Sequence, residues 1–316
     1  MVFLNEYSFF IFAAYMTKIT KTISQDNSAF RQLFNFNVVR SIGLPLIIYL
    51  VYNFLASFLH VESYLSGFKI SSMVYSILGL ALGLLLVFRT NSAYERWWEG
   101  RRLLGVLTNN SRALAMRVEN MTPHKDEQIE LIRRLATFVM SFRWYLRNED
   151  TAQNTPYLNH AERHHLAQKQ HPVNALAKNL YQYVAHLSSK GYFSDTIQLT
   201  FEGYFTAFVE VIGGCERIKR TPIPMAYSVH LRHFLYLYLY SLPFTMLHEM
   251  GYWAIFVNAL VFYALAGLKK IGEEIEDPFG RDINDLPLDA ICMNICVNIC
   301  ELTNITTEEL LEQKAQ

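Results

Sequence analysis

The sequence predicts an all-α membrane protein with four transmembrane helices and a cytoplasmic helical bundle. Two runs of 19 residues, 70–88 and 250–268, contain no charged side chain, and a helix needs about 20 apolar residues to cross the hydrocarbon core. The long polar middle of the chain has apolar residues at helical spacing and no sustained strand-like alternation. The basic residues gather on one side of the apolar runs, as the positive-inside rule requires of paired spans.

Two further runs complete the four spans. Residues 43–61 contain no Asp, Glu, Lys or Arg, although Asn53 and His60 lie inside them. Residues 234–247 are the weakest of the four runs, because they are short and contain Pro243, which interrupts helical hydrogen bonding. This run must extend back into polar sequence to reach the length of a span.

Lysine and arginine fix the predicted orientation. The loops within each pair of spans are poor in them, whereas the outer ends of the runs are rich in them. The basic flanks are Arg31, Arg40, Arg89, Arg96, Arg101, Arg102, Arg217, Lys219, Arg220, Lys269 and Lys270. Both termini and residues 89–224 are therefore predicted to be cytoplasmic. The first apolar run has no cationic segment before it, so we expect no secretory signal peptide.

The predicted organisation has five segments. They are an N-terminal cytoplasmic or interfacial segment (1–36), transmembrane helices 1 and 2 (37–89), a cytoplasmic helical domain (90–224), transmembrane helices 3 and 4 (225–270) and a cytoplasmic C-terminal helical segment (271–316). Lys and Arg together number 28, as do Asp and Glu. This balance gives no reason to expect a nucleic-acid partner, and membrane lipid is the partner that the spans imply.

The second span carries the clearest candidate for function. Leu80, Leu84 and Phe88 follow one another at intervals of four and form a bulky apolar stripe, beside the small pair Gly79 and Gly83. In a symmetric oligomer such a stripe could line a narrow hydrophobic constriction. The alternative is ordinary contact with lipid or neighbouring helices, and the residues alone favour that alternative.

Two polar clusters suggest metal chemistry without fitting a known pattern. The segment 273–289 holds seven acidic residues around a turn at Pro278 and Gly280, but its spacing is not that of an EF-hand. A solvated turn is the favoured interpretation.

His160, His164 and His165 lie near Glu162 but not in HExxH order. Cys292, Cys296 and Cys300 form a helical stripe typical of packing. No GxSxG, P-loop or GxGxxG motif supports an enzyme.

Three phrases, in this order, carry a resemblance to a known family. They are SILGLALGLLLVFRTNSAYERWWEGRRLLG (76–105), which contains RTNSAYERWWEGR (89–101), then CERIKRTPIPMAY (215–227) and IEDPFGRDINDLPLD (275–289). The chain resembles the bestrophin family, most closely its bacterial branch, over most of its length. The resemblance implies a homopentameric channel of a bacterial inner membrane that passes small monovalent ions through one central pore. It places a hydrophobic neck at Leu80, Leu84 and Phe88, and a second constriction near Asp195–Gln198, with Ile197 as the apolar candidate.

The chain departs from the animal members at the calcium-binding turn. Arg281 follows Gly280, and Ile283 and Asn284 interrupt the acidic run, so only Asp282 and Asp285 remain as cation-binding candidates. No cofactor is therefore expected, and calcium stays an alternative. Either chloride or a cation could be the permeant ion. Leucine rings give no preference for anions, which tilts the prediction slightly towards a cation or a weakly selective pore.

Two other functions are also compatible with the sequence. The large segment 89–224 would equally suit a membrane-anchored scaffold or sensor whose cytoplasmic helices bind a partner. A metal-dependent membrane enzyme using the histidine or acidic cluster is the other alternative.

Overall fold

The computed structural model describes residues 36–61, 71–121 and 124–312. None of these residues forms a β-strand, which confirms the predicted all-helical fold. The described residues divide into two compact units. One joins the chain up to Val87 with Val229–Ile271, and the other joins Phe88–Ser228 with the chain from Gly272 onward.

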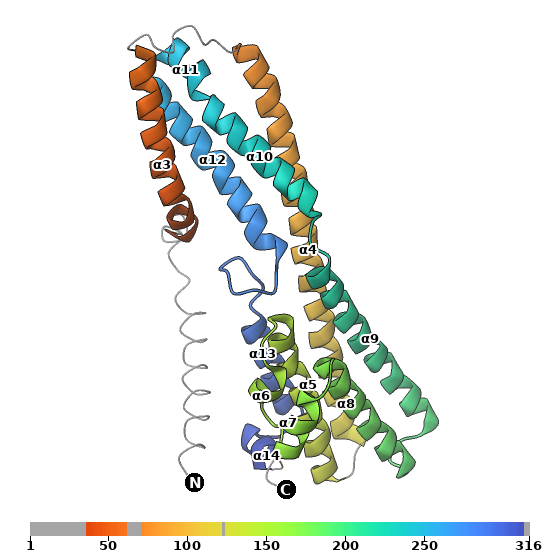
Figure 1. The fold of residues 1–316 in the computed structure, drawn as a ribbon. Coiled ribbons are helices and arrows are strands. Elements are labelled where there is room, and N and C mark those ends of the chain that lie inside the picture. Colours follow the sequence, from red (N-terminus) through yellow and green to blue (C-terminus); the bar gives the residue numbers. More distant parts are fainter. Residues whose placement is uncertain (1–35, 62–70, 122–123, 313–316) are drawn as a thin grey trace, which may run out of the picture. The chain divides into compact units, whose positions relative to one another are not determined.

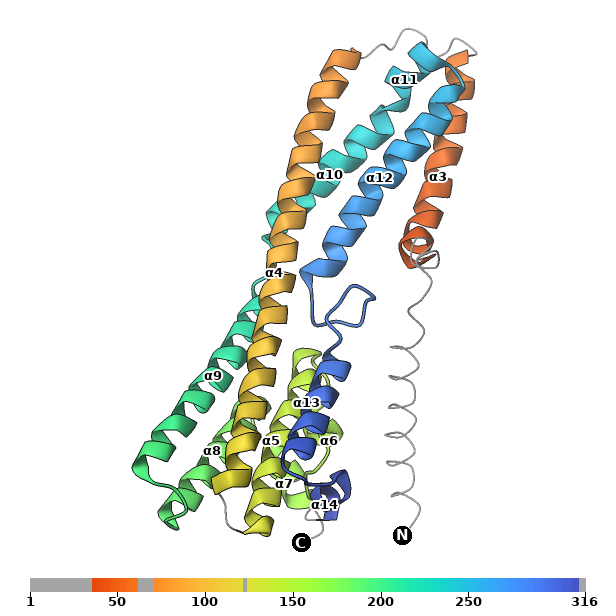
Figure 2. The ribbon, with the colours of Figure 1, turned by 180° about the vertical axis from the view of Figure 1, so that it is seen from behind.

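The first unit is built from long apolar helices (Figures 1 and 2). They are α3 (Phe36–Val61), the beginning of α4 (Ser72–Met121), α10 (Met225–Ser241), α11 (Pro243–Met250) and α12 (Trp253–Glu276). Three segments within the described residues are long and apolar enough to cross a membrane, namely Ser41–Leu59, Ser72–Glu119 and Trp253–Glu276. They correspond to the first, second and fourth predicted runs.

The third predicted run is not one continuous helix. It divides between α10, which ends at Ser241, and α11, which begins at Pro243. Proline has no backbone N–H, and its ring crowds the carbonyl four residues earlier, so the helix breaks here. The third predicted span therefore rests on two shorter helices.

Tyrosines from α3 satisfy the backbone at this break. Because Pro243 lacks an N–H, the carbonyl of Leu239 loses its helical donor. The Tyr49 hydroxyl donates to Leu239 O at 2.9 Å, and the Tyr52 hydroxyl donates to the adjacent carbonyl of Tyr240. The Tyr49 side chain is fully buried, and its ring stacks on Phe262 of α12 at a centroid distance of 4.5 Å. Without the Tyr49 donor, the buried carbonyl of Leu239 would incur a desolvation cost.

A pair of asparagines joins α3 to α12. Asn258 Nδ2 donates to Asn53 Oδ1 at 2.8 Å, and Asn53 Nδ2 donates to the carbonyl of Tyr49, also at 2.8 Å. Both asparagines are buried. Asn53, the polar interruption in the first predicted run, thus faces another helix.

The second unit surrounds helix α5 (Figure 2). Its helices are α5 (Lys125–Leu146), α6 (Thr151–Asn154), α7 (His160–Ala167), α8 (Pro172–Ser189), α9 (Asp195–Arg220), α13 (Leu288–Leu302) and α14 (Thr307–Glu312), with the remainder of α4. Helix α5 packs against α6, α8, α9, α13 and α14. Phe138 and Phe142 of α5 are fully buried, and Phe138 meets Phe208 of α9 at 5.2 Å between ring centroids. Helix α5 therefore forms the core of this unit.

The break at Pro243 generates a double-mutant test. Tyr49→Phe is expected to lower the free energy of unfolding by about 1–3 kcal/mol, because it leaves the Leu239 carbonyl buried without a donor. In a Pro243→Ala background the same substitution should lose less stability, because alanine supplies the missing helical N–H. Unfolding in detergent micelles measures both values.

Tyr75→Phe is the matched control, since Tyr75 is also buried in this unit. Its hydroxyl makes no hydrogen bond to a described residue, so this change should lose much less stability. Equal losses for Tyr49→Phe in the two backgrounds would contradict the assignment.

Candidate functional site

Helix α4 has one packed side and one open side in the single chain. Leu80 is 77% exposed, Leu84 54% and Phe88 56%. Leu82 and Leu86, on the opposite side, are buried. At about 100° per residue, the three predicted neck residues lie within one side of the helix. The spacing that singled them out is therefore matched by an uncovered apolar stripe.

The two glycines beside the stripe differ in their surroundings. A Cβ placed on Gly79 would lie 2.7 Å from the hydroxyl of Tyr238 on α10, so close packing of α4 and α10 requires glycine there. Nothing within the described residues comes within 4 Å of a Cβ on Gly83. Gly79 therefore lies at a close contact between two helices of the same chain.

Directly after Phe88, helix α4 is anchored to the end of α12. Arg89 is nearly fully buried and forms an ion pair with Glu276, with 3.0 Å between Nη2 and Oε2. The other oxygen of Glu276 accepts the backbone N–H of Ile223 at 3.1 Å. One carboxylate therefore connects α4, α12 and the segment that leads into α10.

Arg96, two helical turns further on, binds the ends of two helices at once. Its Nε donates to the carbonyl of Glu276 at 3.0 Å, and its Nη2 donates to that of Ile218 at 2.6 Å. Its Nη1 donates to the carbonyl of Thr221. Carbonyls in the last turn of a helix lack intrahelical donors and carry partial negative charge, so a guanidinium is a suitable cap. Arg89 and Arg96, two of the three arginines in the RTNSAYERWWEGR phrase, are thus structural anchors.

The turn after α12 packs on the same stretch of α4. Phe279 is buried, and a Cβ on Gly100 would lie 3.2 Å from its ring. Trp97 Nε1 donates to the carbonyl of Asn284 at 2.9 Å. Asp289, at the start of α13, receives Arg143 at 3.0 Å and Arg147 at 2.6 Å. These contacts fix the acidic segment as a folded structural turn.

Sequence reasoning treated these basic residues as membrane flanks or members of an amphipathic helix and missed their partners. The pairing of α5 with Asp289 joins residues more than 140 positions apart. The one feature of the sequence that could have indicated this pairing is the spacing of Arg143 and Arg147, four residues apart on an otherwise apolar helix face.

Asp282 and Asp285 lie in the same turn. Asp285 Oδ2 accepts the N–H of Asp282 at 2.6 Å, and a Cβ on Gly280 would also lie 2.6 Å from that oxygen. Burial raises the pKa of Asp285 to about 6, and the nearby carboxylates of Asp282 and Asp277 add to the effect. Among the described residues, no group of three or more metal-ligating side chains comes together. The cation site therefore stays a prediction.

The predicted cytoplasmic constriction lies at the beginning of α9. Ile197 is half-buried, on the side of α9 that carries the buried Phe201 and Phe208. Leu199, two residues further on, is 73% exposed on the other side. Ile197 stays a prediction, and Leu199 is the apolar side chain at this end that the single chain leaves open.

The cysteine stripe occupies a packed position. Cys292 and Cys296 are buried free thiols on α13, and burial raises the pKa of Cys292 to about 12. Thiols held in this protonated form are poor nucleophiles and metal ligands, in line with the packing interpretation.

Long apolar helices with an open apolar stripe define a helical membrane protein. The model of the family described as bacterial/fungal bestrophin protein matches residues 21–301. The chain therefore belongs to the bestrophin family, as its resemblance indicated.

Curated relatives and a solved structure extend this finding. A voltage-dependent anion channel-forming protein of Nostoc is 37% identical over 233 residues, covering 72% of this chain and 76% of the relative. The voltage-dependent anion channel-forming protein YneE of Escherichia coli is 33% identical over 239 residues, covering 75% of this chain and 79% of YneE. The crystal structure of a bestrophin homologue from Klebsiella pneumoniae superposes with a TM-score of 0.80 at 27% identity, covering 84% of this chain and 99% of that one.

The raised pKa of Asp285 predicts a pH-dependent stability. Since its folded pKa of about 6 lies above the unfolded value of about 3.9, the folded state binds more protons between these values. The contribution of Asp285 to stability is therefore present below pH 4 and is lost as pH rises through 6. Asp285→Asn should remove this component and raise stability at pH 7.5 by about 1 kcal/mol, a value reduced for solvent screening. Thermal melts across pH, with a chelator present, measure it.

Asp126→Asn is the control, because it removes an exposed carboxylate of the same unit that does not act on Asp285, so the Asp285 component should be unchanged. Repeating the titration with Ca²⁺ tests the cation site. A bound cation would hold Asp285 ionised and shift its transition to lower pH. An Asp285→Asn variant with the pH profile of the parent chain would contradict the burial argument.

Proposed function

We propose that this chain forms a homopentameric anion channel of the bacterial inner membrane, with α4 lining a central pore. The open side of α4 carries the proposal. Helices α3 and α12 also expose apolar side chains, as contact with lipid requires. On α4, however, the open side continues past Phe88 through the exposed residues Asn91, Tyr94 and Trp98. An uncovered side that passes from apolar to polar residues suits a pore wall better than a lipid contact.

The narrowest part of the pore would lie at Leu80, Leu84 and Phe88. In a five-fold ring each of these side chains occurs five times around the axis, so three stacked apolar rings form the neck. Water leaves narrow apolar constrictions readily, and such a neck can gate ion flow by dewetting. Symmetric rings are the usual way for a chain with few spans to enclose a pore.

The topology that accompanies this proposal has four spans and both termini in the cytoplasm. Helices α10 and α11 together form the third span, with the Pro243 break inside it. The cytoplasmic part comprises segments 90–224 and 271–316. The distribution of basic residues supports this arrangement, and the tyrosine donors at the break support burial of α10 in an apolar surrounding.

The relatives favour anions over the cation preference that the leucines suggested. Both curated relatives are named as anion channel-forming proteins, which also supports a channel rather than a scaffold or sensor. Within this chain, Phe88 is the neck side chain with a suitable property, because the positive edge of an aromatic ring attracts anions. The proposed permeant species are small monovalent anions such as chloride.

The neck assignment predicts that Leu84→Ala increases ion flux several-fold, because a smaller side chain widens the ring and admits water. Flux from liposomes reconstituted with the purified protein measures it. Leu78→Ala is the matched control, because Leu78 lies about 160° around α4 from Leu80 and is only 37% exposed. Unchanged flux in Leu84→Ala, or an equal increase in both variants, would contradict the neck.

Ion selectivity is tested by the reversal potential in asymmetric NaCl. Its sign should indicate anion passage, and Phe88→Ala should move it towards zero by removing the aromatic edge. Phe88→Leu separates this effect from ring size, since leucine keeps an apolar side chain without a quadrupole. A potential of cation sign in the unmodified protein would overturn the anion proposal while leaving the channel intact.

A further inference from the structure

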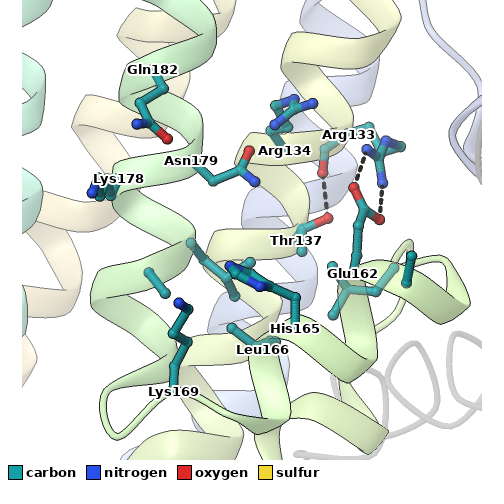
Figure 3. Close-up of a pocket in the computed structure, with 14 residues that line it drawn as sticks. Arg133, Arg134, Thr137, Glu162, His165, Leu166, Lys169, Lys178, Asn179 and Gln182 are labelled. Atoms are coloured by element: carbon teal, nitrogen blue, oxygen red, sulfur yellow. Dashed lines mark hydrogen bonds and ion pairs between the residues drawn. The ribbon is translucent and has the colours of Figure 1, made fainter.

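A cavity of about 390 Å³ opens between α5, α7 and α8 in the second unit (Figure 3). This volume falls in the range of small-molecule sites. Leu158, Leu166 and Leu176 contribute buried apolar surface to its lining. In Figure 3 the Asn179 amide extends from α8 toward α5, and the His165 ring lies between α7 and α8.

The lining carries an excess of positive charge. Arg133, Arg134, Lys169 and Lys178 line the cavity, and Glu162 is the acidic residue among them. Glu162 is already occupied, since it binds Arg133 through both oxygens at 2.9 and 3.1 Å and accepts the N–H of Asn159 at 2.9 Å.

Glu130, just outside the cavity, is occupied in the same way. It binds Arg133 Nε at 2.6 Å and Arg134 Nη2 at 2.6 Å. Four cationic side chains thus face two carboxylates, which leaves an excess of two positive charges. Lys169 and Lys178 have no ion pair with any carboxylate in the described part of the chain.

Two polar atoms of the lining are buried without a hydrogen-bond partner among the described residues. They are Nε of Arg134, a donor, and Oδ1 of Asn179, an acceptor. Native proteins rarely leave such atoms unpaired, because each one forfeits its hydration. A ligand with an anionic acceptor group and a separate donor would satisfy both atoms.

We propose that this cavity binds a small organic dianion, a phosphomonoester or a dicarboxylate, that has an apolar body and a hydrogen-bond donor. The dianionic group pairs with Lys169, Lys178 and Nε of Arg134. The donor binds Oδ1 of Asn179, and the body packs on the leucines. The site lies within the second unit and is independent of the proposed channel function.

Binding is tested by calorimetric titration of the full chain in detergent. The phosphomonoester probe is 4-aminophenyl phosphate, the dicarboxylate probe is 4-aminophthalate, and 4-aminobenzoate is the monoanionic comparison. At least one dianion should bind saturably at one per chain, and about tenfold more tightly than the monoanion. Whichever dianion binds identifies the head group. Absence of saturable binding by both, or equal binding of the monoanion, overturns the proposal.

Variants then locate the site. Lys169→Gln and Lys178→Gln should each raise the dissociation constant about tenfold, and their exposed positions should leave the melting temperature without probe unchanged. Lys190→Gln is the matched control, because Lys190 is also on this unit but pairs with Glu127 outside the cavity. An equal effect of all three substitutions, or none, overturns the assignment.

Asn179→Leu addresses the donor separately. It should weaken binding of 4-aminophenyl phosphate and leave that of phenyl phosphate unchanged, because the latter has no amine. Equal weakening of both probes contradicts the contact with Asn179.

Discussion

The rotation of α4 about its own axis is the constraint on which the proposed pore depends. Arg89 and Arg96 are seven residues apart and so lie within about 20° of each other, on the side opposite Leu80. Both reach Glu276, one through its carboxylate and the other through its carbonyl. A buried guanidinium that loses its carboxylate is left as an uncompensated charge. These bonds hold the arginine side of α4 inward and leave the side of Leu84 and Phe88 open.

Much of the fold follows from features that are local in sequence. Nineteen uncharged residues before Arg89 suffice to predict an apolar helix, and Pro243 marks the third run as the weakest. The partners of the resulting break could not be predicted, because nothing local connects Tyr49 with a carbonyl 190 positions away. A tyrosine in an apolar run has the same pattern whether it contacts lipid or caps a carbonyl. The sequence likewise could not show what Asn53 contacts inside the apolar run. The structure shows that its partner is Asn258.

In the candidate site, too, the features that are local in sequence could be predicted, and the contacts between distant residues could not. Helical spacing placed Leu80, Leu84 and Phe88 on one side of α4. The family resemblance then suggested that this stripe is a pore neck. The acidic segment was identified as a turn, but its role in packing depends on Arg143 and Arg147, which come from a distant helix. The cavity was not predicted, because His165 and Lys169 lie in a polar stretch of sequence that is typical of solvated structure. Only the packing of α7 against α8 and α5 brings this stretch to the cavity.

Helix α5 supports both the cavity and α4, the helix that we propose as the pore wall. Arg133 and Arg134 near its middle line the cavity, while Arg143 and Arg147 at its end hold Asp289 and the turn that packs on Gly100. This chain of contacts from the cavity to α4 does not by itself couple ligand binding to α4. A ligand shifts a conformational equilibrium only when it binds two conformations of the protein with different affinity. The bonds around Asp289 argue for a rigid connection, since its two carboxylate oxygens bind Arg143 in the last turn of α5 and Arg147 directly after it. A bound dianion that acted on α4 through this turn would have to move α5 as a body, and the buried phenylalanines of α5 oppose that motion.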